Sequence, residues 1–234
     1  MIRMNFLSRL FFVPNCPACG RPTEGCVAPA GEGSVFCGQC ALAISPLPPP
    51  WCPGCGIPVI LDGPCARCLR EPPPFSGAIS ALPYEGPVMS AIRRGKYGPV
   101  PWIFGRLGPL LTPLLEAVGP SIVVPMPVTS AAWRTRGFSP PRQLCAAACR
   151  ELPRRDYPVR ELLRRTRDSP AQAFLTMAER QKLSPAEFAA TGSAEGARVI
   201  LVDDVVTTGA TVSAAARALE GAAGIWVVSL CRTL

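Results

Sequence analysis

Two adjacent carboxylates follow a long apolar run in the segment VILVDDVVTTGAT, residues 199–211. A continuous apolar run predicts a strand that is buried on both faces, as in a parallel sheet covered by helices. Such a strand would deliver Asp203 and Asp204 to the carboxyl edge of the sheet, where open α/β sheets bind their ligands. The first question is therefore which ligand would use two neighbouring acids at this edge.

The residues after the acids have the composition of a phosphate-binding turn. Small residues predict a turn into a helix, whose free N–H groups and positive dipole end favour an anion. Gly209 would let the backbone approach a phosphate closely, and the neighbouring threonine hydroxyls would face it. Two carboxylates beside a phosphate could accept hydrogen bonds from a ribose diol and help to hold the Mg²⁺ that accompanies a diphosphate. The candidate phosphosugar-binding residues are Asp203, Asp204, Val205, Val206, Thr207, Thr208, Gly209, Ala210 and Thr211.

Eight of the twelve cysteines form four Cys-x-x-Cys pairs, each of which could present two thiolates to one metal ion. Two such pairs complete a tetrahedral zinc site, so four pairs predict two structural zinc ions. The segment PLPPP at 46–50 separates the first two pairs from the last two, which favours pairing in chain order, although a cross-braced arrangement uses the same ligands. Pairing in chain order gives one site from Cys16, Cys19, Cys37 and Cys40 and another from Cys52, Cys55, Cys65 and Cys68.

The alternative to zinc is a disulfide scaffold, which would need an oxidising compartment. Residues 1–14 are apolar but short, and they contain no small-residue cleavage site of a secretory signal, so we expect a helix packed on the body. No apolar run reaches the roughly 18–20 residues that cross a bilayer, and we expect a cytoplasmic protein. The remaining cysteines are interpreted as packing residues: Cys26, Cys145, Cys149 and Cys231.

Strands alternate with helices through the rest of the chain, which predicts a parallel sheet wrapped by helices. Three prolines at 72–74 can continue neither a helix nor a central strand, so we place a domain boundary there, between residues 1–72 and 75–234. The expected strands are 76–86, 121–128, 159–166, 197–204 and 225–232. The expected helices are 87–98, 104–119 with a bend near Pro113, 139–154 and 209–224.

Positive charge dominates, with 24 Lys+Arg over 16 Asp+Glu. Residues 134–167 contain ten arginines and three acids, a net charge of +7 that could follow a nucleic-acid backbone. A solvated helix face that also collects phosphate ligands is the alternative. Only three aromatic residues accompany this stretch (Trp133, Phe138 and Tyr157), which gives little support for base stacking. The chain has no histidine, so acid–base chemistry would fall to Asp, Glu or Lys.

The combination of motifs resembles the ComF family, which is associated with natural competence. The segment 199–211 is similar to the 5-phosphoribosyl-1-pyrophosphate (PRPP) motif of type I phosphoribosyltransferases. Ser139 and Pro140 stand where the family usually has Asn-Gln, and Leu183 stands where it has Asn. The residues that match the family elsewhere are Val124–Val128, Arg136, Gly137, Phe138, Gln172, Leu175 and Arg180.

The resemblance implies an α/β fold, in which a type I phosphoribosyltransferase-like parallel sheet flanked by helices follows a small double zinc ribbon. It implies PRPP or a related phosphosugar as ligand, with Mg²⁺. Asp203, Asp204 and Arg136 would be the catalytic residues. Arg134 and Arg136 would neutralise the pyrophosphate, the alternative being that both are ordinary surface arginines.

The function implied by the resemblance is that of a competence accessory protein. Such a protein assists the uptake of single-stranded DNA into the cytoplasm, together with translocation proteins at the inner membrane, where it could be peripheral. The alternative is an active phosphoribosyltransferase of nucleotide salvage or synthesis that releases pyrophosphate from PRPP. Residues 167–190, where an acceptor would dock, contain no motif that identifies one, and no helix-turn-helix supports a duplex-DNA regulator.

Overall fold

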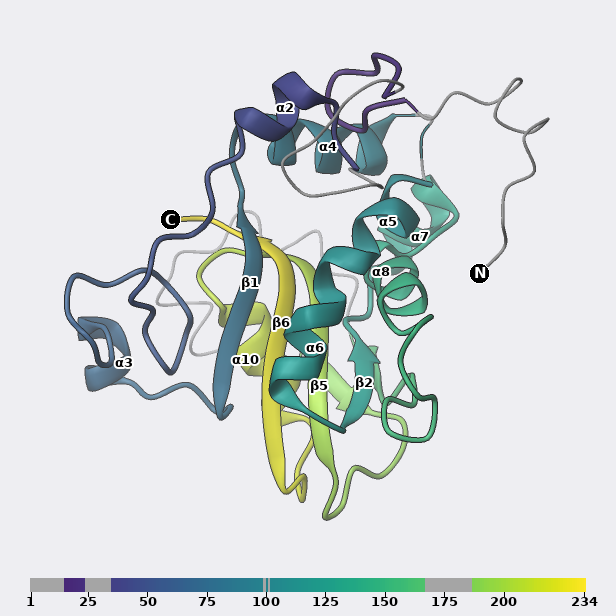
Figure 1. Cartoon of the computed structure of the whole chain (residues 1–234). Coiled ribbons are helices and arrows are strands. Elements are labelled where there is room, and N and C mark those ends of the chain that lie inside the picture. Colours follow the sequence, from purple (N-terminus) through teal and green to yellow (C-terminus); the bar gives the residue numbers. More distant parts are fainter. Residues whose placement is uncertain (1–14, 24–34, 99, 101, 167–186) are drawn as a thin grey trace.

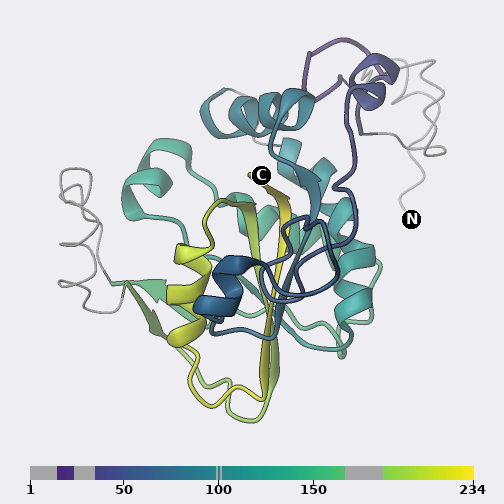
Figure 2. The same ribbon diagram turned by 90° about the vertical axis from the view of Figure 1, so that its left-hand side faces the viewer.

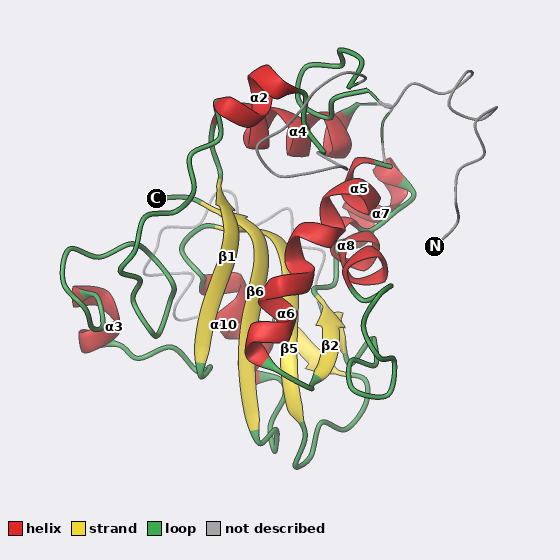
Figure 3. Cartoon of the chain, in the orientation of Figure 1, coloured by secondary structure: helices red, strands yellow, loops and turns green. Residues whose placement is uncertain are grey.

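A four-stranded parallel sheet forms the centre of the computed structural model, which describes residues 15–23, 35–98, 100, 102–166 and 187–234. The strand order is β1-β6-β5-β2 (Figures 1 and 3). The parallel sheet flanked by helices is therefore confirmed. In that spatial order the strands are β1 (Gly77–Pro83), β6 (Gly224–Arg232), β5 (Arg198–Val206) and β2 (Ile122–Pro125).

Alternate side chains of β5 enter two separate cores, because successive residues of a strand point to opposite faces. Ile200 and Val202 pack in the core beneath helices α5, α6 and α8, whereas Val199 and Leu201 pack beneath α10. Figure 2 shows these helices on opposite sides of the sheet. Their bounds are α5 (Ile103–Leu107), the 3-10 helix η1 (Gly108–Leu111), α6 (Thr112–Val118), α8 (Pro140–Ala148) and α10 (Ala210–Arg217).

The expected strand at 159–166 does not join the parallel sheet. Residues Leu163–Arg165 form β3, which pairs antiparallel with β4 (Phe188–Ala190) in a separate hairpin. Before the hairpin, the chain reaches the main sheet at one bridge between Val159 and Val123, where the backbone of Val123 forms hydrogen bonds with Pro158 and Arg160. The apolar residues of this hairpin, Leu163 and Phe188, pack in the same core as α10.

Several element bounds also differ from expectation. β5 continues two residues beyond its expected end, so that Val205 and Val206 belong to the strand. The helices expected to end at 154 and 224 end at Ala148 and Arg217. The short helix α7 (Ser130–Arg136) was not expected; the Thr129 side chain caps it by accepting a hydrogen bond from the Ala132 N–H at 3.0 Å.

The remaining helices lie in or beside the cysteine-rich segments. These helices are α2 (Gly38–Leu42), α3 (Ala66–Arg70) and α4 (Gly86–Tyr97). No helix in the described ranges combines the length and apolar character of a bilayer-crossing segment. Cys145, Cys149 and Cys231 lie in the core, as expected.

Some expectations fall on residues outside the described ranges. These are the N-terminal helix, the packing role of Cys26, and Gln172, Leu175, Arg180 and Leu183 in the segment 167–186. The domain boundary at 72–74 stays a prediction.

The bend of the expected helix 104–119 lies at η1, where the backbone tightens between α5 and α6. Pro113 itself lies in the first turn of α6, a position that tolerates proline because no hydrogen bond is lost there. Gly108 is buried at this bend. A Cβ atom added to it would lie 2.4 Å from the Cβ of Ala147 and 2.8 Å from the carbonyl oxygen of Leu144.

We predict that Gly108→Ala lowers the free energy of unfolding by about 1–3 kcal/mol, the usual cost of forcing a methyl group into a packed core. The matched control is Gly105→Ala in α5, because no atom lies within 4 Å of a Cβ at that position. Alanine there should stabilise slightly, since it favours a helix over glycine. Urea denaturation measures the free energy of unfolding of both variants. Equal stability of Gly108→Ala and wild type would contradict this close approach of η1 and α8.

Candidate functional site

A cavity of about 290 Å³ lies at the carboxyl end of the sheet, and Asp203 and Asp204 both line it. Thr211, in the first turn of α10, lines the same cavity, and the segment 126–129 that follows β2 forms another wall. The carboxyl ends of neighbouring parallel strands meet at one edge, which explains why segments far apart in the sequence converge here. The cavity therefore brings together the acids and one of the expected phosphate-binding threonines.

Asp204 forms an ion pair with Lys96, with 2.6 Å between Oδ2 and Nζ. Asp204 is only 6% exposed, and Lys96 comes from the last turn of α4. Burial alone would lower the pKa of Lys96, but the charges of Asp204 and Asp203 outweigh burial and raise it. The lysine therefore stays charged and balances Asp204. Sequence reasoning missed Lys96. The rarity of lysine was a signal, because Lys96 and Lys182 are the only two lysines in the chain.

Asp203 is the more accessible of the two acids. Its Oδ1 accepts a hydrogen bond from the backbone N–H of Asp204 at 2.8 Å. Burial, followed by the charge of Asp204, raises the pKa of Asp203 well above its usual range. The ionised form of Asp203 is thus destabilised until a ligand group, such as a hydroxyl or a cation, compensates it.

Two arginines join Lys96 around the cavity. Arg136, at the end of α7, lies with its guanidinium carbon 5.4 Å from the centroid of the Tyr97 ring. Arg165, in β3, donates from Nε to the carbonyl oxygen of Pro127 at 3.1 Å, and it pairs with Glu187. Sequence reasoning missed Arg165 because residues 159–166 were expected in the main sheet. Three cations and two acids suit a ligand that carries both phosphates and hydroxyls.

The other residues that we expected in the phosphosugar site do not line the cavity. Arg134 is exposed and does not line the cavity, so its role in binding pyrophosphate stays a prediction. Val205 and Val206 end β5, and Thr207 and Thr208 are exposed in the turn that follows. Gly209 adopts a left-handed conformation with φ of 79°, and Ala210 begins α10. The turn thus leads directly into the helix, with its N–H groups at the edge of the sheet.

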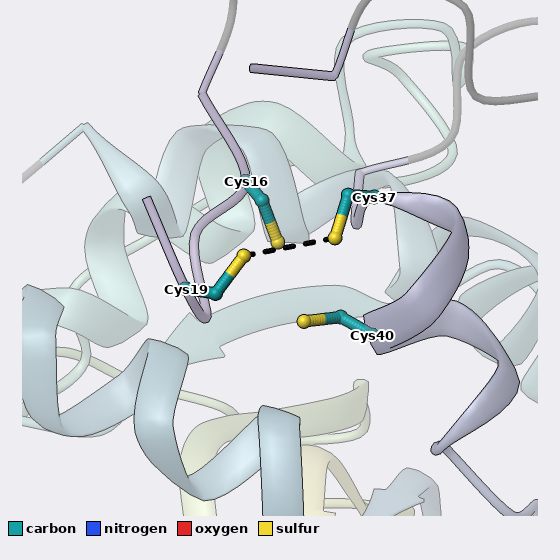
Figure 4. Close-up of side chains that lie close together, drawn as sticks. All are labelled: Cys16, Cys19, Cys37 and Cys40. Atoms are coloured by element: carbon teal, nitrogen blue, oxygen red, sulfur yellow. Dashed lines mark hydrogen bonds between the residues drawn. The ribbon is translucent and has the colours of Figure 1, made fainter. Parts of the chain in front are cut away.

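The eight paired cysteines form two tetrads, and the sulfurs of each tetrad lie within 4.8 Å of one another. Figure 4 shows Cys16, Cys19, Cys37 and Cys40 pointing to a common centre. The members of each tetrad follow one another in the chain, as pairing in chain order predicted. The second tetrad consists of Cys52, Cys55, Cys65 and Cys68.

The sulfur spacing fits a tetrahedral zinc ion. The Sγ atoms of Cys19 and Cys37 are 3.6 Å apart, and those of Cys55 and Cys65 are 3.7 Å apart. Four Zn–S bonds of about 2.3 Å place tetrahedral sulfurs about 3.8 Å from one another. A disulfide requires about 2.05 Å, so these distances do not describe one. Each tetrad could therefore hold one zinc ion.

Backbone hydrogen bonds favour the thiolate of one cysteine in each tetrad. A hydrogen bond from the backbone of Arg21 is the largest effect on Cys19 and lowers the pKa of its thiol to about 6. Burial raises the pKa of Cys52, but hydrogen bonds from the backbone of Cys55, Cys65 and Gly54 outweigh it and leave the pKa at about 6. The thiolate is the form that binds zinc, so these turns prepare a ligand in each tetrad.

We predict that the purified protein contains two zinc ions per chain, because both tetrads have the ligand number and spacing of a structural site. The double variant Cys16→Ser/Cys19→Ser should contain one, measured by atomic emission. Cys149→Ala, which removes a cysteine outside both tetrads, is the control and should retain two. Equal zinc content in all three proteins would contradict the assignment.

We also predict that Asp203→Asn raises the free energy of unfolding at neutral pH. A carboxyl whose pKa is higher in the folded than in the unfolded protein binds more protons when folded, so it destabilises the fold increasingly as pH rises above the usual 3.8. The asparagine removes this cost, and its advantage should vanish as pH falls below 3.8. Urea titrations from pH 3 to pH 8 measure the difference in free energy of unfolding between the variant and the wild type. Glu151→Gln, at an exposed position, is the control. A difference that does not change with pH would contradict the raised pKa of Asp203.

Comparison with known proteins adds independent observations. Residues 147–231 match the family described as "Phosphoribosyl transferase domain". The chain is 33% identical to DNA utilization protein YhgH of Escherichia coli (strain K12) over 195 residues, which cover 78% of this chain and 84% of that protein. The chain belongs to the ComF family. Its relative of the same name in Salmonella typhimurium (strain LT2) is 31% identical over 209 residues, which cover 85% and 91% of the two chains.

This ComF-family protein combines two cysteine tetrads with a phosphoribosyltransferase-like parallel sheet, as the motifs predicted. A solved structure, titled "Structure of the allosteric regulatory enzyme of purine biosynthesis", matches 54% of this chain and 25% of that chain, with 23% identity and a TM-score of 0.37. A TM-score this low supports no conclusion about function.

Proposed function

We propose that this ComF-family protein binds PRPP with Mg²⁺ and assists the uptake of single-stranded DNA during transformation. The observation that carries the proposal is the cavity at the end of β5, where two acids, three cations and Thr211 face one space. A phosphosugar diphosphate presents the complementary groups: a diol for a carboxylate, and phosphates for cations and helix N–H groups.

Each part of the ligand has a chemical counterpart in the cavity. Asp203 accepts hydrogen bonds from the ribose diol, because Asp204 is already engaged by Lys96. Arg136, which takes part in none of the ion pairs among the described residues, neutralises the diphosphate, and Lys96 and Arg165 line the same cavity. Carboxylate oxygens are the ligands that Mg²⁺ prefers, and the ion would reduce the charge of the diphosphate when bound. Thr211 and the start of α10 contact the 5′-phosphate.

Two observations support a role with single-stranded DNA. The relatives that match the chain carry the name DNA utilization protein. Within the Arg-rich stretch, the arginines at 134, 142, 150, 154, 155, 160 and 164 are exposed, as contact with a polyanion requires. We place the protein in the cytoplasm, at the inner face of the inner membrane beside the translocation proteins. Unchanged transformation of a competent host after deletion of the gene would contradict this role.

An active phosphoribosyltransferase is the second candidate, and the position of the cations favours it. Lys96 and Arg136 lie in the same cavity as the two acids. Cations placed in this way stabilise a departing pyrophosphate, and a nearby carboxylate supports the positive charge that develops on the sugar. Incubation with PRPP, Mg²⁺ and a panel of bases or ammonia tests it, and no pyrophosphate release with any acceptor counts against it.

We predict that PRPP·Mg²⁺ binds to the wild type and that Arg136→Ala weakens binding about tenfold or more. The reason is that a hydrogen bond between charged groups contributes about 1.5–3 kcal/mol. Isothermal titration calorimetry measures both affinities. Arg155→Ala is the matched control, because this arginine is 89% exposed and does not line the cavity. Absence of PRPP binding by the wild type would refute the proposed ligand.

A further inference from the structure

The second ribbon, residues 51–70 with the second cysteine tetrad, lies directly against the phosphate loop, residues 207–209. Arg67 lies in α3 between Cys65 and Cys68, and its Nη1 donates a hydrogen bond to the backbone carbonyl oxygen of Thr208. The segments lie more than a hundred residues apart in the chain, yet Arg67 and Cys68 of α3 line one pocket with Thr208 and Gly209 of the loop. The residue that contacts the loop is thus fixed on both sides by metal ligands.

The end of β6 makes a second connection between the ribbon and the sheet. Arg232 is 3% exposed, and its Nη1 donates to the carbonyl oxygen of Cys55. None of the ion pairs among the described residues involves Arg232, although a buried guanidinium needs a compensating negative charge. A zinc ion with four thiolates carries a net charge of −2, which supplies it.

Arg232 is also adjacent to the origin of the phosphate loop. In the sheet it pairs with Val206, the last residue of β5, and the N–H of Thr233 donates to the Val206 carbonyl at 3.1 Å. The phosphate loop begins at the next residue. The second ribbon therefore contacts the loop at Thr208 and the strand position beside its first residue.

The turn that holds Cys52 and Cys55 is packed on β1 without spare room. Gly56 has a left-handed backbone with φ of 71°, and a Cβ atom there would lie 2.2 Å from the carbonyl oxygen of Ala78. The backbone of this turn therefore lies in close contact with β1, and a side chain at position 56 would push the ribbon away from the sheet.

We propose that the second ribbon positions the phosphate loop through Arg67 and Arg232, so that loss of metal from this tetrad weakens phosphosugar binding. The ligand in this inference rests on the proposed function; the positioning role does not. The first tetrad provides an internal contrast. Its segments contact α4 and α5: Arg94 donates to the carbonyl oxygens of Cys16 and Pro17 at 3.3 and 3.1 Å, and Arg106 donates to those of Asn15 and Val35.

The first test compares Arg67→Ala with Arg70→Ala, which alters another exposed arginine of α3. We expect Arg67→Ala to raise the dissociation constant for PRPP·Mg²⁺ about fivefold, the effect of losing one net hydrogen bond. Arg70→Ala should bind as the wild type does, and both should retain full zinc content. Equal affinity of the two variants would overturn the role of Arg67.

The second test needs no ligand. Amide hydrogen exchange of residues 207–213 should become faster in Arg67→Ala and in Cys65→Ser, because the loop loses its support. Cys37→Ser, in the first tetrad, should instead affect residues 86–97 and leave the loop unchanged. If Cys65→Ser unfolds the ribbon, the exchange rates of residues 207–213 in Arg67→Ala, with both zinc ions in place, decide whether the ribbon positions the loop.

The two tests separate the inference from the proposed function. Faster loop exchange in a protein whose wild type does not bind PRPP would support the positioning role and refute the proposed ligand. Unchanged loop exchange in both Arg67→Ala and Cys65→Ser would overturn the positioning role, whatever the wild type binds.

Discussion

Two neighbouring carboxylates at the buried end of β5 impose the constraint on which the site depends. Like charges this close cannot both be ionised in a poorly solvated place without compensation. The structure resolves the conflict by treating the two acids differently: Lys96 neutralises Asp204, whereas the pKa of Asp203 rises. Asp204 is thus engaged within the structure, whereas Asp203 lines the cavity and takes part in none of the ion pairs among the described residues. The ion pair also requires α4 to lie at a fixed position above the sheet edge.

The cysteine tetrads lie where the site needs support. The first contacts α4, which carries Lys96, and the second contacts the loop between β5 and α10. Neither ribbon has an extensive apolar core of its own, since the described ribbon segments are short and rich in glycine and proline. Metal binding would therefore supply both the folding energy of the ribbons and the rigidity of the elements against which they pack.

The sequence predicted the features that depend on local patterns. The apolar run of β5, the turn after Asp204 and the spacing of the cysteine pairs each carry their information within a few residues. Lys96 and Arg165 were not found, because their roles arise from contacts between distant segments. Strand β3 was assigned to the wrong sheet, and β4 was not expected, for a related reason: a strand of three residues has the same composition whether it pairs with the main sheet or in a separate hairpin. The helix α7 is short and basic, with no apolar periodicity to reveal it.

The interior of β5 has no side chain that faces water. Residues 199–202 each belong to one of the two cores, so a polar replacement at any of them would bury an unsatisfied group, and a change of size would disturb a packed layer. Beyond Val202, Asp203 is partly exposed and lines the cavity, whereas Asp204 and Val206 are again buried. Within β5, a change of ligand preference that leaves both packed layers undisturbed is therefore confined to position 203.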